Sequence, residues 1–62
     1  MVGKIVSVDP VKVRVRGGRV ETVIVRAMDT ALELENCGVG DRIEVTRVVN
    51  CPYLVFQGVT NG

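Results

Sequence analysis

Basic side chains recur at every second position in one short stretch of the chain. Lys12, Arg14 and Arg16 alternate with valines, and Arg19 follows after two glycines. In an extended strand, alternate side chains point to the same face and lie about 6–7 Å apart. That spacing is close to the separation of successive phosphates, so such a ridge can follow a nucleic-acid backbone. The alternative is a solvated strand face whose charges also prevent sheet aggregation.

Three further side chains complete the candidate site. Arg26 and Arg47 are expected to extend the basic surface. Tyr53 is one of only two aromatic residues in the chain. It is expected to stack on a base, which contributes about 1–3 kcal/mol per base, with packing at the rim of the folded core as the alternative.

The residue types argue against catalysis. The chain has no histidine, which is the usual general base near neutral pH. Ser7, Cys37 and Cys51 therefore lack the partner that activates a nucleophile, and a four-cysteine zinc site would need a second chain. Gly38 and Gly40 lack the lysine, the Ser/Thr and the helix of a phosphate loop. We expect no enzyme, no catalytic residue, no metal and no cofactor.

The two cysteines and the first residues bear on the cellular compartment. Two cysteines are too few for a secreted disulfide scaffold, so we expect reduced thiols that fill space, with a single disulfide as the alternative. The stretch MVGKIVSVDP lacks the features of a signal peptide, and no apolar run reaches the ~20 residues that span a bilayer. These features predict a cytoplasmic protein with no membrane partner.

Charge is divided unevenly along the chain. Residues 1–27 carry six basic and two acidic side chains, whereas residues 28–62 carry two basic and five acidic ones. The halves are therefore +4 and −3, although the whole chain is only +1. This asymmetry places the candidate anion-binding surface in the first half.

The elements that must position these side chains are predicted to be strands. Apolar residues alternate with polar ones repeatedly, and no window shows sustained helical spacing. Fifteen valines and three isoleucines favour strands, because branched side chains suit a pleated sheet. The predicted strands are 2–16 (bent at Pro10), 19–27, 30–35, 42–50 and 53–60, with a two-residue turn at Gly17-Gly18.

Five short strands in 62 residues predict a single closed domain, residues 1–62. An open sheet of this composition would leave an apolar face and two edges exposed, and a barrel removes that problem. Leu32, Leu34 and Phe56 are expected to point inward, and a bulge is expected near Thr46-Arg47. Residues 36–41 are expected to be a loop, at a place where many five-stranded barrels have a helix. The predicted fold is all-β, a small five-stranded barrel with no or only a vestigial helix.

Three stretches resemble a known family. GKIVSVDPVKVRV, RVETVIVRAMDTALELEN and VGDRIEVTRVVNCPYLVFQG resemble the OB-fold (oligonucleotide/oligosaccharide-binding) proteins of the single-stranded DNA-binding family, the type found in replication protein A and archaeal single-stranded DNA-binding proteins. The resemblance covers most of the chain and implies a Greek-key barrel that binds single strands. This sequence departs from the family at 32–36, which lacks the usual stacking aromatic.

These observations predict a module that binds single-stranded nucleic acid, DNA more than RNA, without strong sequence preference. One alternative is a protein-interaction or oligomerisation module, either a homo-oligomer or part of a replication or RNA-protein assembly. A second alternative is a fragment or designed minimal barrel without a native ligand.

Overall fold

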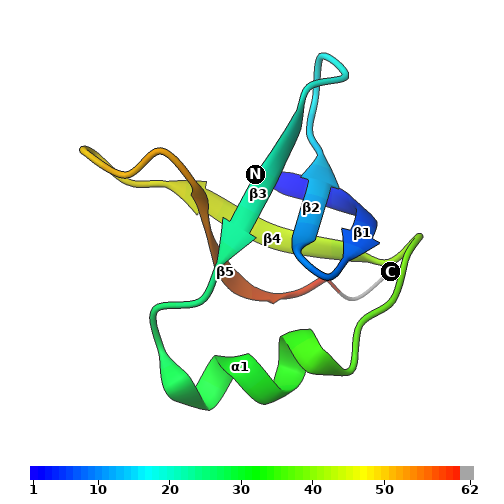
Figure 1. Ribbon diagram of the computed structural model, residues 1–62, viewed down its shortest axis with the longest axis vertical. Helices are drawn as coiled ribbons and strands as arrows, with labels where there is room; N and C mark the ends of the chain where they lie inside the picture. Colours follow the sequence, from blue (N-terminus) through cyan, green and yellow to red (C-terminus); the bar gives the residue numbers. More distant parts are fainter. Residues whose placement is uncertain (61–62) are drawn as a thin grey trace.

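The computed structural model describes residues 1–60, which form five strands and one helix (Figure 1). In chain order the elements are β1 (Val2–Val8), β2 (Val11–Arg14), β3 (Val20–Ile24), α1 (Met28–Glu35), β4 (Arg42–Arg47) and β5 (Leu54–Val59). The strands close into a barrel in the order β1-β2-β3-β5-β4. All neighbouring strands are antiparallel except the pair β3 and β5. The predicted class, a small all-β barrel of OB type, is confirmed.

The predicted third strand is wrong, because residues 28–35 form α1. The stretch Leu-Glu-Leu-Glu alternates like a strand, but Ala, Leu and Glu are all strong helix formers. In a helix, residues two apart lie on nearly opposite sides. Accordingly Leu34 is 8% exposed and packs on the barrel, whereas Leu32 is 67% exposed and does not point inward.

The barrel still has five strands because the predicted first strand is two. Residues 2–14 fold back at Asp9-Pro10 into the antiparallel pair β1 and β2. The Gly17-Gly18 turn therefore joins β2 to β3. Both glycines have positive φ, +97° and +87°, and the Gly18 N–H donates to the Val15 carbonyl at 3.0 Å. The predicted position of this turn is correct, but its place in the strand order is not.

The barrel core is filled mainly by branched aliphatic side chains. Its most deeply buried members are Ile5, Val13, Ile43, Val45 and Leu54. Phe56 is also buried, as predicted. The predicted bulge near Thr46-Arg47 is wrong: these residues pair regularly with Val55 and Leu54, and the irregularity lies opposite Glu44 and Val45, where β5 has the extra residue Gln57.

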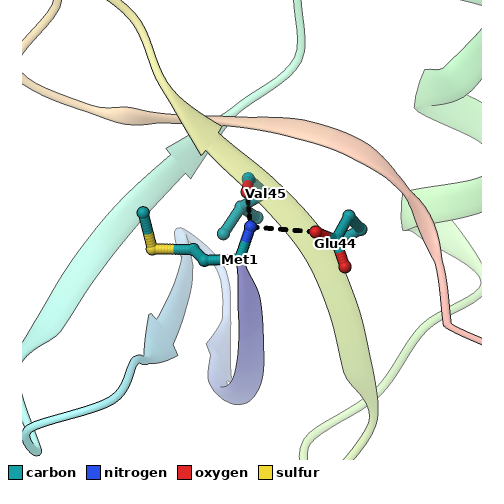
Figure 2. Close-up of polar contacts among 3 residues, drawn as sticks. All are labelled: Met1, Glu44 and Val45. Carbon is teal, nitrogen blue, oxygen red and sulfur yellow. Dashed lines mark hydrogen bonds and ion pairs between the residues drawn. The ribbon is translucent and has the colours of Figure 1, made fainter.

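The first residue of the chain is hydrogen-bonded to β4. The Met1 amino group lies 2.8 Å from Glu44 Oε1 and donates to the Val45 carbonyl at 2.7 Å (Figure 2). The Val45 N–H in turn donates to the Met1 carbonyl at 2.8 Å. These bonds extend the β1–β4 ladder, so β1 is paired along both of its sides.

No helix within residues 1–60 is long and apolar enough to cross a membrane. The two cysteines are not joined by a disulfide. The Cys37 thiol donates to the Glu33 carbonyl at 3.3 Å. Burial, and then the nearby carboxylates of Asp41 and Glu33, raise the pKa of the Cys37 thiol. The predicted reduced thiols are therefore what the structure contains.

Candidate nucleic-acid interface

The predicted ridge lies on the outer side of β2 and the turn that follows it. Val13 and Val15 are buried in the barrel, so the side chains that alternate with them point outward. Lys12, Arg14 and Arg16 are all exposed, and so is Arg19 beyond the glycine turn. The structure therefore brings these four predicted residues together along one strand and one turn.

Lys12 is the centre of a mixed polar row across the sheet. It is paired with Ser7 on β1 and with Thr22 on β3. In parallel register, Leu54 on β5 lies beside Val23. Tyr53 comes directly before Leu54, outside the paired residues of β5, and is 46% exposed. Chain connectivity therefore places it near the Thr22 end of this row.

Arg14 belongs to a second row that sequence reasoning did not single out. It is paired with Lys4 on β1, and Lys4 is paired with Arg42 on β4. All three side chains are exposed. Each is recognisable in the sequence as a basic residue next to a buried one. Their alignment depends on the strand register, which the sequence pattern did not provide.

The cations of these two rows have no carboxylate partner. Within residues 1–60, the ion pairs are Arg47 with Glu21 and the Met1 amine with Glu44. Every lysine and every arginine except Arg47 is thus without an ion pair in this part of the chain. Their positive charge remains available to a ligand.

Arg47 lies apart from the ridge. It continues the inward-facing series Ile43 and Val45 on β4, and its guanidinium binds both oxygens of Glu21 at 2.5 and 2.6 Å. Glu21 is paired with the buried Val13, so it also lies on the inner side. The ion pair therefore joins β3 to β4 at one end of the barrel and neutralises Arg47.

Arg26 also lies apart from the ridge. It is exposed and falls between the end of β3 and the start of α1. The β2–β3 turn and α1 stand at opposite ends of the molecule (Figure 1). Arg26 is thus at the α1 end, away from Arg16 and Arg19.

Several acidic side chains lie on the helix, away from the basic β2–β3 turn. Glu33 and Glu35 belong to α1, together with Asp29, and not to a strand as predicted. They therefore lie at the end opposite the basic turn. Glu44 is on β4, but it is bonded to the Met1 amine. The three acidic residues of α1 are thus distant from the basic turn, whereas Glu21 lies on β3 and Asp41 directly precedes Arg42.

Comparison of the chain with protein-family models, with curated proteins and with solved structures gave no match.

Proposed function

We propose that this protein binds single-stranded nucleic acid through the outer face of β2, without strong sequence preference and with DNA favoured over RNA. The observation that carries the proposal is the outward series Lys12, Arg14 and Arg16, continued by Arg19, in which no side chain forms an ion pair within residues 1–60. A flat row of point charges contacts phosphates, which carry no sequence information. Tyr53, at the border of this face, supplies a surface on which any base can stack.

The resemblance to single-stranded DNA-binding proteins supports the same proposal. In OB folds, oligonucleotides bind over strands 2 and 3, flanked by the loops between strands 1 and 2 and between strands 4 and 5. Here the ridge is on β2, and Tyr53 is in the loop that leads into β5. Arg26 and Arg47 are omitted from the proposed site because of their positions.

The first test replaces a ridge cation. Arg14→Gln is expected to weaken binding of fluorescent oligo-dT about threefold to tenfold at low salt, because it removes a phosphate contact. The slope of log affinity against log salt should become shallower by about 0.7, the value per contact for single strands. Fluorescence anisotropy over a salt series measures both quantities.

Arg26→Gln is the matched control, since it removes the same charge at the other end of the molecule. If both variants weaken binding equally, the effect is one of net charge and the proposed face is wrong. Absence of oligo-dT and oligo-U binding by the wild-type protein at low salt would reject the function itself.

The second test concerns Tyr53. Tyr53→Ala is expected to weaken oligo-dT binding by about fivefold or more, since stacking contributes about 1–3 kcal/mol. Tyr53→Phe retains the ring and should bind like the wild type. Equal affinities for the Ala and Phe variants would mean that Tyr53 only packs at the barrel rim. Thermal melting of each variant shows whether folding is affected.

A protein-interaction module is the second candidate function. A free fifth strand would favour it by β-addition, but β5 is paired on both sides in the closed barrel. The favouring observation is instead on α1, where Met28 and Leu32 are 90% and 67% exposed. These residues are four apart and share one helix face. A stable dimer by light scattering, combined with no oligonucleotide binding, would support this candidate.

A further inference from the structure

A line of three like charges crosses the barrel at right angles to the ridge. Arg42 on β4, Lys4 on β1 and Arg14 on β2 are consecutive Cα partners, and we call them the cross-strand row. Neighbouring strands are about 4.8 Å apart, so the row spans about 10 Å at the backbone. All three side chains are exposed on the outer side of the sheet.

This arrangement is unfavourable in the free protein. Like charges directly opposite each other on adjacent strands destabilise a sheet, and Lys4 has such a neighbour on both sides. No carboxylate within residues 1–60 forms an ion pair with any of the three. Asp41, which directly precedes Arg42, accepts a hydrogen bond from the Gly38 N–H, and Glu44 on β4 is bonded to the Met1 amine. An external anion would therefore lower the repulsion within the row.

The backbone beneath the row is well fixed. Lys4 lies on β1, which is hydrogen-bonded to β2 and to β4. The Arg42 carbonyl accepts bonds from the Thr60 hydroxyl at 3.0 Å and from the Thr60 N–H at 3.4 Å. The Cα positions of the three residues are therefore held in register, so their charged side chains start from neighbouring points on the sheet.

Arg14 belongs both to the row and to the ridge. The ridge runs along β2, and the row leaves it at Arg14 toward β1 and β4. An anion that interacts with both needs regularly repeated negative charges over several residues, as in a nucleic-acid backbone. A single phosphate is too small to contact both.

We infer that the bound single strand extends beyond the β2–β3 face and crosses β1 and β4, with its phosphates on Lys4 and Arg42. This inference rests on the proposed function and specifies the path of the ligand. The cross-strand row thus lengthens the binding site and sets the number of nucleotides that one protein molecule covers.

The test compares oligonucleotide lengths. The variants Lys4→Gln, Arg42→Gln and the double variant are titrated with oligo-dT of about 4 and about 12 nucleotides, both within the roughly 4–16 nucleotides that one OB fold covers. The double variant should bind the long oligonucleotide about tenfold more weakly at low salt, and its salt slope should be shallower by about 1.4. Affinity for the short oligonucleotide should fall much less, because the β2 ridge is intact.

Thermal stability provides an independent readout. Lys4→Gln removes two like-charge contacts, so the melting temperature of the free protein should rise at low salt, and the increase should disappear at high salt. A variant that merely damages the fold would melt lower. Weaker binding together with a higher melting temperature is the result expected of a functional cation.

Two outcomes separate the inference from the proposed function. If Arg14→Gln weakens binding while the double variant binds both lengths like the wild type, the path over β1 and β4 is wrong and the ridge remains. If Arg14→Gln and the double variant both bind oligo-dT with the same affinity as Arg26→Gln, both proposals fail. Equal losses for the short and long oligonucleotides would also overturn the extended path.

Discussion

Leu34→Ala is expected to lower the free energy of unfolding by about 2–3 kcal/mol, and Leu32→Ala by less than about 0.5 kcal/mol. Leu34 is the buried side chain of α1. It lines a pocket of about 390 Å³ between the helix and the barrel that is open to solvent, so the substitution removes apolar contacts that the neighbouring side chains do not replace. Leu32 is mostly exposed, and alanine is the better helix former.

The expected loss of unfolding free energy in Leu34→Ala is large for a chain of this size. Domains of about 62 residues have total stabilities of roughly 3–9 kcal/mol, so Leu34→Ala removes a third or more of the smaller values. Urea denaturation followed by circular dichroism measures both variants. If residues 30–35 were a strand with both leucines inward, the two substitutions would cost similar amounts. Equal losses would therefore contradict the helix.

Residues 30–35 were predicted to be a strand but belong to α1, and the reason lies in their pattern. Alternation of Leu and Glu over four residues fits a strand and also fits a helix with one buried leucine. In such a short segment the hydrophobic pattern does not decide between them, and the propensities of Ala, Leu and Glu carry the information. The alternating valines of residues 11–14 have no such ambiguity and were correctly predicted to be extended, although the reversal at Asp9-Pro10 that makes them a separate strand was not predicted.

The candidate site also contains residues that the local pattern predicts and residues that it does not. Lys12, Arg14 and Arg16 could be assigned to one face from alternation alone, because that relation is local. Lys4 and Arg42 join Arg14 only through the registers of β1 with β2 and of β1 with β4. The pairing of Arg47 with Glu21 joins residues 26 positions apart. Strand register and ion pairing depend on the closed barrel, so the pattern along the chain did not reveal them.

Gly3→Ala is expected to lower the free energy of unfolding by about 1–3 kcal/mol, the range for overpacking in a full core. Gly3 is buried on β1. A Cβ placed there would lie 2.8 Å from both Cβ and Cγ2 of Val13, which is closer than these atoms can approach. Val13 is fully buried, so it has no free space into which to move. The smaller conformational freedom of alanine in the unfolded chain offsets only about 0.4–1 kcal/mol.

The matched control is Gly58→Ala, because Gly58 also lies in a strand but has no atom within 4 Å of its Cβ position. Gly58→Ala should leave the free energy of unfolding nearly unchanged. A double-mutant cycle with Val13→Gly tests the contact itself, because Val13→Ala would keep the Cβ that lies 2.8 Å away. The Gly3→Ala loss should shrink by about 0.5 kcal/mol or more when position 13 has no Cβ. An unchanged loss in that background would mean that Val13 is not the obstacle.

The same substitution should also affect binding. Gly3 permits β1 to approach β2 closely, and the next residue, Lys4, is thereby set beside Arg14. A methyl group at position 3 pushes the two strands apart and separates Lys4 from Arg14. If the cross-strand row binds phosphates as proposed, Gly3→Ala should weaken binding of the long oligo-dT while the short one binds nearly as before. Titration at a temperature where the variant remains folded separates this effect from lost stability, and unchanged affinity for both lengths would contradict it.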